Sequence, residues 1–170
     1  MLAYDTTNFH TYITGTNTRT GLAQRGHNKQ GRHNLREGSL CCVRDGESGL
    51  AVCHHVYPGN VSETEASPVA LERIQRLLAR QGKPPETVNL VFDKGAAALP
   101  NALLLEEAGL GWISALPWNQ APAEFRQCPV EDLPASSSAL PGVRAAAENL
   151  RVHGKEYHCV LKHSATFAAE

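Results

Sequence analysis

The sequence predicts an α/β protein built on a mixed sheet, with three antiparallel strands followed by parallel strands that are joined through crossover helices. Strand patterns come first, and helix and strand patterns then alternate as far as residue 116. Such alternation is typical of parallel strands whose connecting helices cover the sheet. The 170 residues, of which 42% are hydrophobic, suffice for one ordinary core.

The first three strands are expected to form the antiparallel group. Residues 2–13 are rich in aromatic and β-branched side chains, which favours a strand that starts almost at the first residue. Two further apolar runs, 39–44 and 50–57, flank the turn-forming residues 45–49. This pattern predicts a hairpin.

A helix is predicted over residues 68–81. Ser67 is a capping residue type, Pro68 suits the first helical position, and apolar side chains recur at helical spacing up to Gly82. Patterns for a strand, a helix and a strand follow at 87–92, 100–108 and 112–116.

The chain is expected to contain three regions. Residues 1–116 form the α/β core. Repeated prolines and a run of serines predict a linker over 117–148. Residues 149–170 are expected to hold a β-hairpin that turns near His153 and Gly154.

Charge and cysteine usage narrow the class of protein. Sixteen basic and seventeen acidic side chains nearly cancel, so only local clustering could argue for a nucleic-acid partner. Five cysteines form an odd set, unlike the framework of a small secreted domain, which favours a reducing, cytoplasmic location. No stretch approaches the roughly 20 apolar residues of a membrane helix, so no membrane partner is expected.

Two acidic residues occupy corresponding places on different strands. Asp5 lies in the first strand, and Asp93 directly follows the strand at 87–92. A right-handed crossover sets these strands side by side, so the acids become neighbours. Neighbouring carboxylates suit Mg²⁺ or Mn²⁺ and phosphodiester chemistry. Taken singly, either acid could serve an ordinary turn, but their joint placement favours a metal site.

The connection between the first strand and the hairpin is basic. Residues 10–36 contain no acidic side chain. Basic side chains there could contact DNA phosphates. The candidates are Arg19, Arg25, Lys29, Arg32 and Arg36. A solvated loop explains the same composition, so the segment supports a nucleic-acid partner without establishing one.

Other kinds of site find little support. His54 and His55 are consecutive in a predicted strand and point to opposite faces, which prevents both from binding one metal ion. Cys53 and His55 share a face, but no second pair stands at zinc-ligand spacing, so structural roles are expected. Counting residues leaves a Ser-His-Asp triad open, but the motifs Gly-x-Ser-x-Gly, Gly-x-x-x-x-Gly-Lys-[Ser/Thr] and Gly-x-Gly-x-x-Gly are absent.

Four short strings follow one another in a characteristic order. They are Tyr-Asp-Thr-Thr-Asn-Phe at 4–9, Arg-Gly-His-Asn-Lys-Gln at 25–30, Tyr-Pro-Gly-Asn at 57–60 and Val-Phe-Asp-Lys-Gly at 91–95. In order and spacing they resemble bacterial DDE-type insertion-sequence transposases, whose catalytic domain has a ribonuclease H-like fold. The resemblance spans most of residues 2–116 and, less distinctly, the hairpin near 151–162.

The resemblance implies that Asp5 and Asp93 are the first two acids of a catalytic triad. They would bind Mg²⁺ or Mn²⁺ during DNA cleavage and strand transfer. The third acid, a glutamate, is missing; it is expected on a helix beyond a β-rich insertion, of which residues 117–170 would be the start. Glu106 and Glu107 precede the last core strand and are poor substitutes.

The resemblance also implies a truncated chain that does not complete transposition alone. The expected partners are DNA, both transposon ends and target, together with a second copy or a full-length transposase. The alternative is a noncatalytic DNA-binding or subunit-pairing remnant. A stand-alone nuclease is a third interpretation, which needs another acid close to Asp5 and Asp93.

Overall fold

The computed structural model describes residues 1–26, 31–32, 34–93, 99–137 and 140–164. The chain divides into two compact units, Met1–Ala115 and Leu116–Glu170. In the described part of the chain, no helix combines the length and the apolar character that a bilayer crossing requires.

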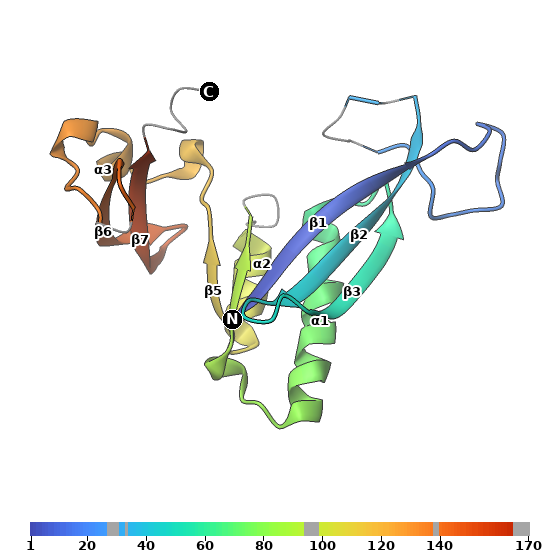
Figure 1. The fold of residues 1–170 in the computed structure, drawn as a ribbon, viewed down its shortest axis with the longest axis horizontal. Coiled ribbons are helices and arrows are strands. Elements are labelled where there is room, and N and C mark those ends of the chain that lie inside the picture. Colours follow the sequence, from blue (N-terminus) through green and yellow to red (C-terminus); the bar gives the residue numbers. More distant parts are fainter. Residues whose placement is uncertain (27–30, 33, 94–98, 138–139, 165–170) are drawn as a thin grey trace. The chain divides into compact units, whose positions relative to one another are not determined.

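The first unit is built on a five-stranded mixed sheet in the order β3-β2-β1-β4-β5 (Figure 1). Its strands are β1 (Leu2–Thr11), β2 (Arg36–Asp45), β3 (Ala51–Pro58), β4 (Asn89–Phe92) and β5 (Gly111–Ser114). The first three are antiparallel neighbours, and β4 runs parallel to both β1 and β5. The predicted α/β class is confirmed, with a mixed sheet of three antiparallel strands followed by parallel strands and with β1 at the point where pairing changes from antiparallel to parallel.

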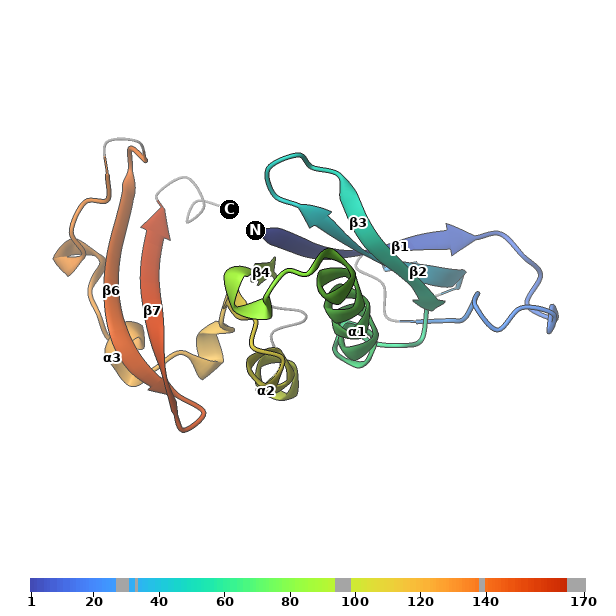
Figure 2. The same ribbon diagram turned by 90° about the horizontal axis from the view of Figure 1, so that it is seen from below.

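Two helices, α1 (Glu63–Gln81) and α2 (Leu99–Glu107), cover one face of this sheet, as Figure 2 shows. A small cavity between the helices and the sheet is lined by Tyr4, Leu90 and Phe92, so these side chains point toward the helices. The buried side of α1 consists of Ala66, Ala70, Ile74 and Leu78. The core therefore lies on one face, and Figure 1 looks onto the other.

The predicted start of α1 is wrong. The helix begins at Glu63, and its N-cap is Ser62, whose hydroxyl accepts from the amide of Glu65 while the Glu65 carboxylate accepts from the amide of Ser62. This capping box satisfies two backbone donors and outweighs the proline signal. Pro68 lies inside the helix, and the Ser67 hydroxyl donates to the carbonyl of Glu63 at 2.7 Å.

The remaining core elements lie close to their predicted ranges. The strand expected at 87–92 is shorter, because a 3-10 turn at Pro85–Thr87 precedes β4. The helix expected at 100–108 is α2, and the strand expected at 112–116 is β5.

The second unit contains a two-stranded antiparallel sheet, β6 (Val143–Val152) and β7 (Lys155–Ser164). His153 and Gly154 both have positive φ, as a tight two-residue hairpin turn requires, and the predicted position of the turn is confirmed. Three short helices precede the hairpin: η2 (Trp118–Gln120), α3 (Ala123–Arg126) and η3 (Val130–Asp132). The assignment of this part to a linker and an insertion stays a prediction.

The segment before β2 is attached to the sheet at Glu37. Gln24 and Glu37 exchange two backbone hydrogen bonds, of 3.0 and 2.8 Å, and the amide of Gly59 donates to the carbonyl of Leu22 at 3.2 Å. A methyl group on Gly59 would lie 2.2 Å from the Glu37 carbonyl oxygen, and one on Gly26 would lie 1.8 Å from that of Gly59. Only glycine permits this approach.

We expect Gly59→Ala to lower the free energy of unfolding by about 1–3 kcal/mol, because the added carbon must push one backbone segment away from another. Denaturant unfolding measures this change. Gly21→Ala is the matched control, since nothing lies within 4 Å of the added carbon there. Equal stability of the two variants would contradict the close packing.

We expect Ser62→Ala to cost about 1 kcal/mol of stability, because it removes the N-cap of α1. Ser67→Ala should have a smaller effect, because the Ser67 hydroxyl bonds back to a carbonyl within the same helix and caps no free backbone donor. Thermal unfolding of both variants compares the two serines. A larger loss at Ser67 would indicate that the helix is capped there.

Candidate functional site

The pairing of β1 with β4 sets the strand segments that precede Asp5 and Asp93 side by side. The strands are parallel, with Leu2 opposite Leu90 and Ala3 opposite Val91. Continued by two residues, this register would set Asp5 opposite Asp93. Neighbouring strands lie about 4.8 Å apart, so residues at such opposite positions stand side by side.

Both acids lie on the face of the sheet that the helices leave open. Tyr4 and Phe92, the residues just before them, are buried against α1 and α2, and side chains alternate along a strand. Asp5 and Asp93 are both exposed. The Asp5 carboxylate accepts from the amide of Thr6 at 2.8 Å. The Ser114 hydroxyl donates to the Asp93 carbonyl at 3.2 Å, which ties the end of β4 to β5.

Three titratable side chains in the core beneath the acids are uncharged. Burial raises the pKa of Tyr4 and of the Cys41 thiol, and burial together with the nearby Glu63 charge raises the pKa of Tyr57 to about 12. All three groups therefore stay neutral near pH 7. No counter-charge to the two carboxylates comes from these three side chains.

A third ligand does not join the pair in the described residues. There, no three His, Cys, Asp or Glu side chains are grouped closely enough to hold a metal ion. Glu63 accepts a hydrogen bond from Thr6, whose side chain lies on the helix-covered face. Cys42 lies directly opposite Asp5 on β2, but a thiolate is a soft ligand that Mg²⁺ does not prefer. The carboxylate pair fits a hard cation that keeps several waters.

The structure separates the basic residues that the sequence grouped together. Arg19 and Arg25 are exposed. The Arg36 guanidinium donates to the carbonyls of Asn17 and Gly15, each at 2.6 Å, and so holds the loop. Arg32 donates to the Tyr12 hydroxyl at 3.3 Å. Lys29 lies outside the described residues.

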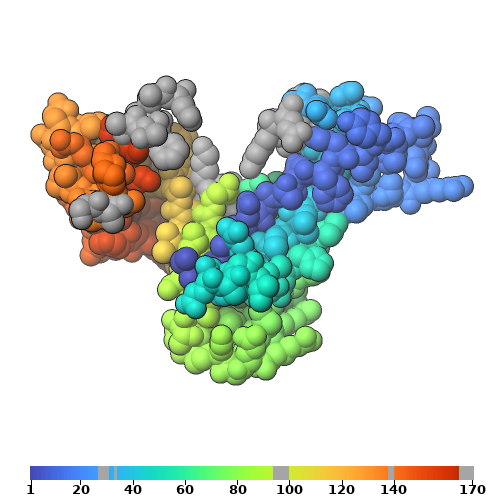
Figure 3. All heavy atoms as spheres, viewed as in Figure 1, coloured from blue at the N-terminus to red at the C-terminus, as the bar shows by residue number. Residues whose placement is uncertain are grey.

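The basic segment projects from the end of β1 that is distant from Asp5. In Figure 1 it continues beyond the ends of β1 and β2, and in Figure 3 its described residues (blue) stand out from the packed strands and helices. The strand rises about 20 Å from Asp5 to Thr11, at roughly 3.4 Å per residue. The exposed arginines and the acids are therefore well separated.

Sequence reasoning missed the importance of Glu37. Its side chain is 0% exposed, although an acidic residue at the start of a strand is expected on the surface. The available signal was the pair of glycines in the strings at 25–30 and 57–60, which indicates two close backbone approaches. The sequence does not show that both approaches are to the same residue.

Comparison with known proteins supports the family. The model of the family described as "Transposase DDE domain" matches residues 2–159. No curated protein sequence matches the chain.

Two solved structures are similar at 15% sequence identity. One is a Mos1 transposase paired-end complex with left transposon end, with a TM-score of 0.43; the match covers 73% of this chain and 38% of the Mos1 transposase chain. The other is a piggyBac transposase synaptic complex with hairpin DNA, with a TM-score of 0.45; the match covers 95% of this chain and 32% of the piggyBac transposase chain. The chain thus spans well under half the length of either transposase. Because the family match extends over nearly the whole chain, the protein belongs to the transposase DDE domain family.

Proposed function

We propose that this chain is part of the catalytic domain of an insertion-sequence DNA transposase, in which Asp5 and Asp93 bind Mg²⁺ or Mn²⁺. The observation that supports the proposal is the parallel register of β1 and β4, which would align the two acids on the open face if it continues to them. Divalent ions at such a site activate an attacking oxygen and stabilise a leaving oxygen in phosphoryl transfer.

The contribution of the protein is to fix the two carboxylates. Asp5 lies within the central strand, and the chain around Asp93 is held by the bond from Ser114. A site on a sheet is positioned more rigidly than one on a free loop. The acids would therefore require little reorganisation when a cation binds.

DNA is the proposed partner, as transposon ends and as target. Arg19 and Arg25 are exposed and could each neutralise one phosphate. The rise of about 20 Å from Asp5 to the end of β1 corresponds to about six nucleotides at roughly 3.4 Å per base step. We therefore place the arginine contacts several nucleotides from the reacting phosphate. A second copy or a full-length transposase would share the complex.

The carboxylate pair supports only part of the reaction. Two acids leave most coordination positions to water, which gives weak cation binding. We propose that the chain alone does not complete cleavage and strand transfer. The second candidate function, a noncatalytic DNA-binding or subunit-pairing protein, is favoured by the absence of a third ligand among the described residues.

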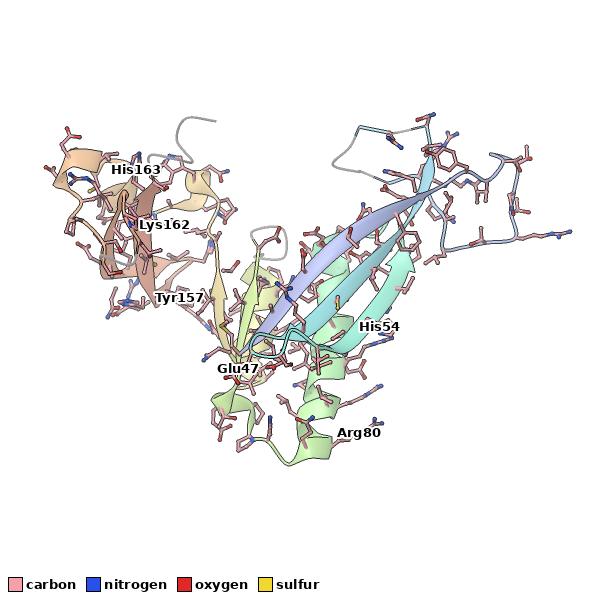
Figure 4. All side chains as sticks on the ribbon, viewed as in Figure 1. Glu47, His54, Arg80, Tyr157, Lys162 and His163 are labelled. Carbon is pink, nitrogen blue, oxygen red and sulfur yellow. The ribbon has the colours of Figure 1, made fainter. Side chains whose placement is uncertain are left out.

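We expect Mn²⁺ affinity to fall at least about tenfold in Asp5→Asn and in Asp93→Asn, because each removes one of two anionic ligands. Isothermal titration calorimetry measures this affinity. Glu47→Gln is the matched control, since it removes the same charge from the turn between β2 and β3 (Figure 4). Equal binding by all the variants would exclude the site.

We expect Arg19→Ala and Arg25→Ala each to reduce the slope of log affinity against log salt for duplex DNA by about 0.9, because each loses one phosphate contact. Fluorescence anisotropy across a salt series measures the slope. Arg80→Ala, near the end of α1, is the control and should leave the slope unchanged (Figure 4).

The same assay separates the two candidate functions. In the catalytic proposal, Mn²⁺ strengthens DNA binding by the wild type, and the double variant Asp5→Asn, Asp93→Asn loses this effect. In the noncatalytic alternative, Mn²⁺ and both acids are without influence, while neutralising the arginines abolishes binding.

A further inference from the structure

Glu37 carries a buried carboxylate, although its position in a strand does not require an acidic side chain. Its backbone amide and carbonyl both hydrogen-bond to Gln24. Glu37 is also opposite His10 of β1, and because its backbone groups are used by Gln24, Glu37 and His10 form a pair without backbone hydrogen bonds between them. Side chains approach closely in such pairs, and His10 Nδ1 lies 3.7 Å from Glu37 Oε2. Within the described residues, neither carboxylate oxygen accepts a hydrogen bond.

Burying a carboxylate is costly, so its retention calls for a physical role. The contacts of Glu37 indicate that role. A methyl group on Gly26 would lie 2.5 Å from Glu37 Oε1, and one on Gly59 would lie 2.5 Å from its Cγ. The side chain therefore fills the space over two glycines, one from the basic segment and one from the end of β3.

We infer that Glu37 is a positioning residue, which seats Gly26 and thereby fixes the neighbouring Arg25 for contact with a DNA phosphate. This inference rests on the proposed DNA-binding function. Arg25 lies between Gln24, which is bonded to Glu37 in both directions, and Gly26, which is packed against it. A guanidinium on a backbone fixed at both sides loses less conformational entropy when it binds.

Arg19 provides the internal comparison. It is also exposed, but its backbone amide donates to a nearby loop side chain, Asn17 Oδ1, at 2.9 Å. Glu37 should therefore affect the contribution of Arg25 to DNA binding and leave that of Arg19 unchanged.

The first test requires no DNA. Trypsin cleaves after arginine, and native-state cleavage between Arg25 and Gly26 reports local opening of the seat, by which we mean the packing of Gly26 and Gly59 against Glu37. We expect Glu37→Ala and Gly26→Ala to accelerate this cleavage by at least about tenfold, and Glu37→Gln, which keeps the shape, by less than about threefold. Cleavage after Arg76 within α1 is the internal control for global unfolding, and Glu47→Ala is the control variant. Unchanged cleavage after Arg25 in both disrupting variants would overturn the inference.

The second test is a double-mutant cycle with duplex DNA. Glu37→Ala should weaken DNA binding by the same factor as Arg25→Ala, and the two changes combined should weaken it no further. Combined with Arg19→Ala, its effect should multiply. A factor that is identical in both backgrounds would reduce Glu37 to a general structural residue and overturn the positioning role. Faster cleavage with no effect of Arg25→Ala on DNA would support the seat and reject the proposed DNA contact.

Discussion

The parallel pairing of β1 with β4 is the interaction on which the candidate site depends. Asp5 and Asp93 are far apart in the sequence, and this pairing brings the strands that lead to them side by side. The pairing is short, with two residue pairs, but Tyr4, Leu90 and Phe92 point from it into the core beneath α1 and α2. A slip of one residue would turn these apolar side chains to solvent and the acid into the core. The packing of the helices therefore fixes the register of the acids.

A second constraint acts at the opposite end of β1. The motif strings at 25–30 and 57–60 are distant in sequence, yet each contributes a glycine that contacts Glu37. The two glycines allow three chain segments to pack at distances that no larger residue would permit. Packing therefore accounts for the glycine of each string, without assigning either glycine to catalysis.

The sequence predicted the strand order and the acid pair because both follow from local patterns and one chirality rule. An apolar run followed by Asp93, after a helix that follows a three-stranded group, leaves one place for β4. The start of α1 was mispredicted because the proline at 68 was given more weight than the Ser62–Glu65 capping box. Glu37 could not be predicted, because burial of a carboxylate depends on contacts with Gly26, Gly59 and His10 that only the folded chain assembles.

The length of β1 links the two constraints. One rigid strand carries Asp5 near its start and faces Glu37 through His10 near its end, so the acids and the seat of the basic segment cannot move independently. A substrate that contacts both must span a separation of about 17 Å along the strand, at roughly 3.4 Å per residue from Asp5 to His10. A flexible loop attached only at its ends would impose no such distance. Glu37 attaches this loop to the sheet at Gln24 and Gly26, so the separation between the acids and Arg25 is set by the fold. DNA that contacts both the acids and Arg25 would have to match that separation.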